Sequence, residues 1–97
     1  MEERIKMILP IEYMQRIVFK TNDYMIIDVH GLTVKSMSWF LRTIACICRE
    51  GFTMRVIHGF NHGTKLKDAI REDKLISRDH RIIPDITNPG VTLIVCS

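Results

Sequence analysis

The chain has 97 residues, which is enough for one domain and too few for two. It is 46% hydrophobic and 26% charged, as ordinary globular proteins are, so its composition excludes a disordered chain. The net charge of +3 permits a polyanionic partner without requiring one. No apolar run is long enough for a membrane span or a secretory signal, so we expect a cytoplasmic protein that makes no membrane contact.

The first 23 residues carry the weakest pattern. The apolar residues here recur at rough helical spacing: Ile11, Met14, Ile17 and Val18. This spacing predicts a short helix near residues 11–18. Asn22-Asp23 is typical of a turn, and we place the start of the domain there. Residues 1–23 are therefore expected to form an N-terminal arm, and residues 5–18 are a candidate surface for a second copy of the chain or a protein partner.

A strand–helix–strand unit follows the predicted arm. Residues 24–29 are almost all apolar and β-forming, which predicts a strand buried on both faces. Thr33 is a typical N-cap, and apolar residues at helical spacing then predict a helix over 34–50 that stops at Gly51. Residues 52–58 are predicted to form a second strand, parallel to the first because a helix connects the two.

The rest of the chain predicts one more helix and two more strands. The helix is expected over 64–73. A short strand over 81–83 is expected to end at Pro84, which cannot donate a ladder hydrogen bond. Residues 88–90, Asn-Pro-Gly, predict a turn that leads into a buried strand over 91–95. The three cysteines have no CxxC spacing, so we expect reduced thiols: Cys46, Cys48 and Cys96.

Polar residues gather where the two predicted parallel strands end. Asp28 and His30 follow the first strand, and His58 ends the second. Both strands of such a unit end at the same edge of the sheet, so we expect these three side chains to lie together in the crevice where α/β sheets bind ligands. A carboxylate beside an imidazole orients the ring and raises its pKa, as acid–base catalysis requires.

A loop with two glycines follows His58 and leads into the helix predicted from Thr64. The glycines relax the backbone, and the amides at the start of a helix attract anions. We therefore expect a phosphate group to bind at five positions of this loop and helix start: Gly59, Asn61, Gly63, Thr64 and Lys65.

Three segments together resemble the motifs of one family. Residues 27–31, IDVHG, resemble the L/I-D-x-H-G motif of the Smr (small MutS-related) domain. Residues 58–63, HGFNHG, resemble its H-G-x-G-x-G loop, with Asn61 where the family usually has the middle glycine. Residues 88–93, NPGVTL, resemble its closing N-P-G-x-T-x strand. The match covers about residues 24–97, so the chain is identified as a stand-alone, short Smr-like member.

The resemblance implies a two-layer βαβαββ sandwich with a mixed four-stranded sheet, similar to the C-terminal domain of translation initiation factor 3. It also implies nucleic-acid binding and, in many members, endonuclease activity on DNA or RNA. The family's acidic residue and histidines fall on Asp28, His30 and His58, and its loop glycines fall on Gly59 and Gly63. No cofactor or metal ligand is indicated, and the family's cleavage is metal-independent or only loosely dependent on a divalent metal.

Simpler interpretations of the same residues stay open. Asp28 could cap the helix that begins after Thr33, with His30 a hydrogen-bonded residue at the end of a strand. Asn61 tolerates left-handed backbone angles better than other non-glycine residues, so the loop could keep its shape. The alternative function is a module that binds nucleic acid or a protein through the same loop and cleaves nothing.

Overall fold

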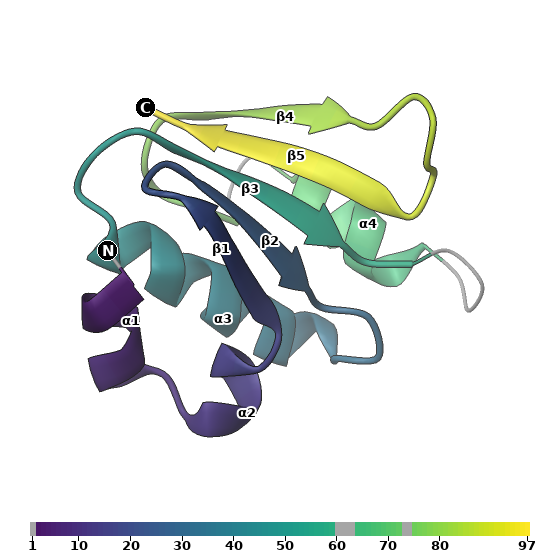
Figure 1. The fold of residues 1–97 in the computed structure, drawn as a ribbon. Helices are drawn as coiled ribbons and strands as arrows, with labels where there is room; N and C mark the ends of the chain where they lie inside the picture. Colours follow the sequence, from purple (N-terminus) through teal and green to yellow (C-terminus); the bar gives the residue numbers. More distant parts are fainter. Residues whose placement is uncertain (1, 60–63, 73–74) are drawn as a thin grey trace.

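The computed structural model describes residues 2–59, 64–72 and 75–97 and shows an α/β fold (Figure 1). Its elements in chain order are α1 (Glu2–Ile8), α2 (Ile11–Met14), β1 (Ile17–Thr21), β2 (Tyr24–Asp28), α3 (Val34–Ile47), β3 (Phe52–Ile57), α4 (Lys65–Arg71), β4 (His80–Pro84) and β5 (Val91–Cys96). The sheet has the order β1-β2-β3-β5-β4. Only β2 and β3 are parallel neighbours, so the sheet is mixed, and the strand–helix–strand prediction is confirmed.

The sheet has five strands where the sequence predicted four. The additional strand, β1, pairs antiparallel with β2 from Ile17 opposite Ile27 onward. Of the helix predicted near 11–18, only the first turn forms, as α2. The prediction of a helix through residue 18 was wrong because Ile17, Val18 and Phe19 are β-branched or aromatic. Such residues favour a strand when a neighbouring strand pairs with them.

The residues before Tyr24 share the core of the rest of the chain. The predicted boundary at Asn22–Asp23 is the turn between β1 and β2. Ile5, Leu9 and Ile17 belong to the same buried cluster as the strands and α3. The segment that was expected to be an arm therefore supplies one strand of the sheet and part of the hydrophobic core.

Helix α3 begins as the sequence predicts and ends earlier. The Thr33 side chain accepts a hydrogen bond from the Ser36 amide at 3.1 Å, which is an N-cap. The helix stops at Ile47, and Cys48 is already extended, so Gly51 is not the residue that ends it. The predicted helix, which extended to residue 50, was three residues too long, because the backbone is already extended at Cys48.

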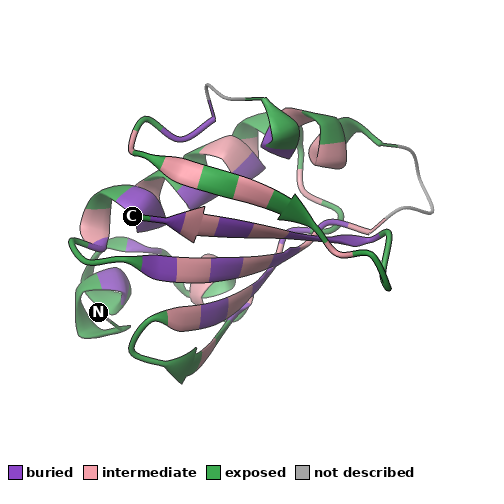
Figure 2. Cartoon of the chain, turned by 90° about the horizontal axis from the view of Figure 1, so that it is seen from above, coloured by how far each residue is buried: buried purple, intermediate pink, exposed green. Residues whose placement is uncertain are grey.

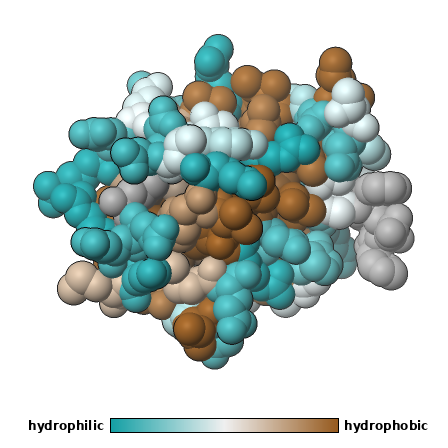
Figure 3. All heavy atoms as spheres, viewed as in Figure 1, coloured by the Kyte–Doolittle hydropathy of each residue, from teal (hydrophilic) through white to brown (hydrophobic). Residues whose placement is uncertain are grey.

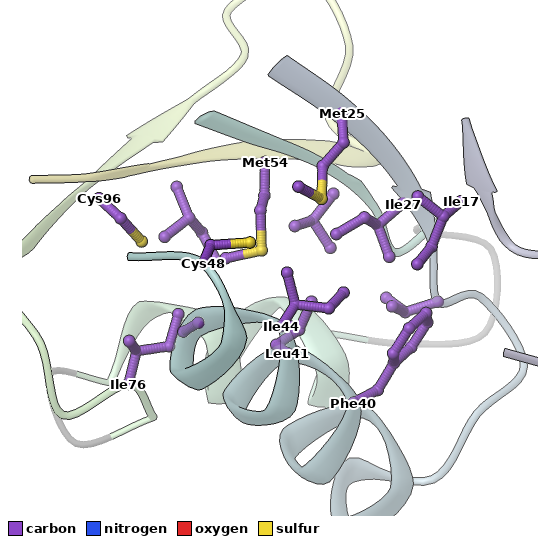
Figure 4. Packing of buried hydrophobic residues seen from close by; sticks show 14 of the residues in the cluster. Ile17, Met25, Ile27, Phe40, Leu41, Ile44, Cys48, Met54, Ile76 and Cys96 are labelled. Atoms are coloured by element: carbon purple, nitrogen blue, oxygen red, sulfur yellow. The ribbon is translucent and has the colours of Figure 1, made fainter. Parts of the chain in front are cut away.

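The helices cover one face of the sheet and enclose the core (Figure 1). Side chains of α3 point toward the strands, and those of β2 and β3 point back toward the helix (Figure 4). Strand β3 alternates buried and half-buried residues along its whole length, as expected for a strand with one face in the core. The labelled members of this packing in α3 and the sheet include Phe40, Leu41, Ile44, Met25, Ile27 and Met54.

The helices of the described residues all lie on one side of the sheet and leave its other face open (Figure 2). The register places Val18 of β1 beside Ile26 of β2, and Ile26 beside Arg55 of β3, on this open face. Asp28 and Ile57 form the next row toward the carboxyl ends of β2 and β3. Residues at the end of this face are therefore open to ligands. The strand residues that alternate with them point to the other side and lie in the core.

Two surface properties bear on partners. None of the described helices has the length and hydrophobicity needed to cross a bilayer. Within the segment predicted to contact a partner, Met7, Ile8 and Ile11 are exposed, whereas Ile5 and Leu9 are buried in the chain's own core. A protein partner or a second copy at residues 5–18 stays a prediction.

Candidate functional site

Asp28 and His30 form a contact at the carboxyl end of β2. His30 Nδ1 lies 2.5 Å from Asp28 Oδ1, and the same carboxylate oxygen accepts a hydrogen bond from the His30 amide at 3.1 Å. The carboxylate therefore orients His30, while Thr33 caps α3. Of the two interpretations of Asp28, the structure agrees with the imidazole partner and not with the helix cap.

The pair is open to solvent. The His30 side chain is 66% exposed and the Asp28 side chain 39% exposed. Because a carboxylate can only accept a hydrogen bond, the proton of a neutral His30 ring must lie on Nδ1. Nε2 is then the unprotonated nitrogen, and it is the atom that can take a proton from a ligand.

A hollow of about 620 Å³ surrounds this pair on the open face of the sheet. Its apolar lining comes from the strands. Figure 3, in the orientation of Figure 1, shows that hydrophobic residues reach the surface of the molecule among hydrophilic ones. Polar groups reach it from the segment of α2 and β1. The lining residues are Val18, Ile26 and Ile57 from the strands, Glu12, Gln15 and Arg16 from the N-terminal segment, and the pair Asp28 and His30.

Sequence reasoning missed Arg16. Its Nη1 donates hydrogen bonds to the carbonyl oxygens of Asp28 and His30, both at 3.1 Å. The Arg16 carbonyl in turn accepts from the Asp28 amide at 2.8 Å. No local sequence signal could have identified this residue, because its partners are main-chain atoms 12 and 14 positions away.

His58 lies in the core and not in the hollow. Its side chain is 5% exposed, and both ring nitrogens have partners. Nδ1 lies 2.8 Å from the Gly59 carbonyl, which can only accept, so Nδ1 carries the proton. Nε2 then accepts from the Thr92 hydroxyl at 2.9 Å. Burial lowers the pKa of His58; the cations of Lys67 and Arg71 lower it further, against the hydrogen bond to Gly59.

The expected convergence of three side chains therefore holds only for two. Alternate residues of a strand point to opposite faces of the sheet, and Asp28 points to the open face, as Ile26 does. His58 continues the core-facing row of β3 that ends at Val56. The sequence carried this signal, because Thr53 and Arg55 alternate with the apolar residues of β3 and mark the side of the strand that His58 does not share. The geometry favours a structural role for His58.

The backbone of His58 and Gly59 still lies beside the pair. A Cβ built on Gly59 would lie 3.7 Å from His30 Cβ, so the ends of β2 and β3 are adjacent as predicted. Gly59 has a φ of +75°, which glycine adopts without strain. Its amide donates to the Gly90 carbonyl at 3.1 Å, so that amide is already occupied and is not free for an anion.

The remaining predicted phosphate ligands are only partly described. Thr64 and Lys65 are exposed at the start of α4, and the Thr64 hydroxyl donates to Asp68 at 2.9 Å. Asn61 and Gly63 lie outside the described residues. Among residues 2–59, 64–72 and 75–97, no three or more His, Cys, Asp or Glu side chains are grouped so that they could hold a metal ion.

Comparison with known proteins gives no match: no protein-family model fits the chain, and no curated protein or solved structure is similar to it.

The role of His58 can be tested through stability. His58→Phe keeps a ring in the core but leaves the Thr92 hydroxyl and the Gly59 carbonyl unpaired, so we expect a loss of about 1–3 kcal/mol in the free energy of unfolding at neutral pH. Thr92→Val removes only one of these hydrogen bonds and should cost less. Urea unfolding of the wild type and both variants measures the difference.

The same variants test the lowered pKa of His58. Below about pH 6.5 the unfolded chain protonates this histidine while the native chain does not, so wild-type stability should fall as the pH drops through that range. The part of the unfolding free energy that depends on the neutral His58 is complete above the unfolded-state pKa. The variant His58→Phe has no imidazole and should lack this dependence on pH. If His58→Phe has the same free energy of unfolding as the wild type and the same dependence on pH, the structural role of His58 is contradicted.

Proposed function

We propose that this chain is an Smr-type domain that binds nucleic acid and cleaves its phosphodiester backbone, as an endonuclease on DNA or RNA. The observation that carries the proposal is the contact between Asp28 and His30 in an open hollow at the carboxyl end of two parallel strands. The order of the three Smr-like motifs and the net charge of +3 support it.

The chemistry follows from the orientation of the imidazole. With Nδ1–H directed at Asp28, His30 Nε2 takes the proton of the attacking hydroxyl group, and the carboxylate stabilises the imidazolium that results. On RNA the attacking group is the neighbouring 2′-hydroxyl. Its oxygen bonds to phosphorus, the bond from phosphorus to the 5′-oxygen breaks, and the leaving oxygen takes up a proton. On DNA a water molecule takes the place of the 2′-hydroxyl.

A second candidate function is a module that binds nucleic acid or a protein without cleaving. The burial of His58 favours it, because only one of the two predicted catalytic histidines is exposed to a substrate. A general acid for the leaving oxygen would then have to be water or the protonated His30 itself. The two functions share a binding surface and differ in whether cut products form.

One assay separates these functions. Labelled single- and double-stranded DNA and RNA are incubated with the purified chain, with and without a chelator, and are analysed for both shift and cleavage. We expect binding that weakens with salt by roughly one log–log unit per phosphate contact, together with cut products. Salt-sensitive binding without products would support the non-catalytic module. The absence of salt-sensitive binding to all four nucleic acids would overturn the endonuclease and the nucleic-acid-binding module, and would leave only a module that binds a protein.

A further inference from the structure

We propose that Arg16 is the positioning residue of the Asp28–His30 pair, so that the segment before β2 is an integral part of the site. The starting point is the register of β1 against β2. Ile17 lies opposite Ile27, so the next residues outward, Arg16 and Asp28, face each other across the two strands. Their main chains are joined by the hydrogen bond from the Asp28 amide to the Arg16 carbonyl.

From this position the guanidinium reaches past the end of β2. Nη1 carries two hydrogens, and its two acceptors are the carbonyls of Asp28 and His30. The Arg16 side chain therefore holds the two residues of the pair at their main chain. In the described part of the chain, no carboxylate forms an ion pair with Arg16, and the guanidinium bonds to these two carbonyls.

Asp28 holds the amide and the ring of His30, and Arg16 holds its carbonyl. His30 lies beyond the last residue of β2, and Gly31, with a φ of +79°, follows immediately. The ring is mostly exposed, so packing does little to fix its direction. If the His30 carbonyl were released, the peptide before Gly31 could rotate, and the 2.5 Å contact between the ring and Asp28 would no longer be enforced.

The role is testable by the tautomer of the His30 ring, without reference to any substrate. When the wild-type ring is neutral, it should be the Nδ1–H tautomer because Asp28 accepts that proton. A histidine without such a partner prefers Nε2–H. Long-range proton–nitrogen NMR spectra distinguish the two forms, and the His30 signals are assigned from their absence in His30→Ala.

We expect Arg16→Met to shift the His30 ring toward the Nε2–H tautomer, and Arg16→Lys, which keeps the charge but loses the paired donor, to do so partially. Lys20→Met is the matched control, because Lys20 is an exposed cation of β1 whose side chain makes no hydrogen bond or ion pair with the described residues. Melting temperatures establish that each variant is folded. A wild-type tautomer in both folded Arg16 variants would overturn the proposal.

The consequence for catalysis rests on the proposed function. If the chain cleaves nucleic acid, both Arg16 variants should lose about 10- to 100-fold in rate, since a misplaced catalytic group is costly. Arg16→Lys should retain salt-dependent binding. Unchanged cleavage in both would contradict the positioning role. If the wild type does not cleave at all, the proposed function fails, and the tautomer measurement still decides the role of Arg16.

Discussion

Replacing His30 by alanine is expected to lower the rate of phosphodiester cleavage by at least about 100-fold, which is the usual contribution of a general acid–base group. The side chain is exposed and its main-chain contacts persist in the variant, so the melting temperature should stay close to that of the wild type. Salt-dependent binding should also persist, because the imidazole is not the source of the phosphate affinity. Cleavage time courses, gel shifts and thermal unfolding measure the three properties.

Asp28→Asn tests the second member of the pair. The amide oxygen can still accept a hydrogen bond from His30 Nδ1, but it lacks the negative charge that stabilises the imidazolium, so the loss of rate should be smaller than in His30→Ala. His80→Ala is the control histidine. His80 pairs with Cys96 at the far end of the sheet and should be dispensable for cleavage. Wild-type cleavage in His30→Ala would remove the pair from the mechanism.

Arg78→Met is expected to lower the free energy of unfolding by about 2–4 kcal/mol, because the guanidinium donates hydrogen bonds to several main-chain carbonyls. Its guanidinium also lies 5.2 Å from the centroid of the Phe52 ring, a cation–π contact. The main-chain carbonyls that it bonds come from the end of α3, the following loop and the C-terminal residue: Ala45, Cys48, Glu50 and Ser97. Methionine keeps the length of the side chain but leaves these carbonyls without their donor.

For a chain of this size such a loss corresponds to a fall of about 10–20 °C in melting temperature. Arg78→Lys should be intermediate, since an ammonium group cannot reach the same set of carbonyls. Arg49→Met is the matched control, because Arg49 is exposed just after α3 and its side chain bonds to none of the residues that the structure describes. A melting temperature of Arg78→Met equal to that of Arg49→Met would show that the network contributes little.

The local patterns of the sequence located most elements because their signals are local. Thr33 caps α3 by accepting from an amide three positions away, and Pro84 ends β4 because it has no N–H to donate. The turn at 88–90 precedes β5, as the Asn-Pro-Gly sequence predicts. The pair of Asp28 and His30 was also readable, since two positions apart on an extended chain bring both side chains to one side.

The missed features depend on atoms distant in sequence. Residues 17–19 suited a helix or a strand, and pairing with β2 decided for the strand. The hydrogen bond that fixes the His58 ring comes from Thr92 of β5, 34 positions along the chain. At the C-terminal end of α3, the Ala45 carbonyl accepts a hydrogen bond from Arg78, which lies 33 positions further along the chain.

The sequence by itself determined the α/β class, the parallel pair of strands and the presence of an acid–imidazole pair where the first of them ends. These properties depend on hydrophobic periodicity and on residues within a few positions of each other. The tertiary structure alone decided that Arg16 belongs to the site and that Thr92 fixes the His58 ring. Both outcomes arise from hydrogen bonds between segments far apart in the chain, whose partners the order of residues does not specify.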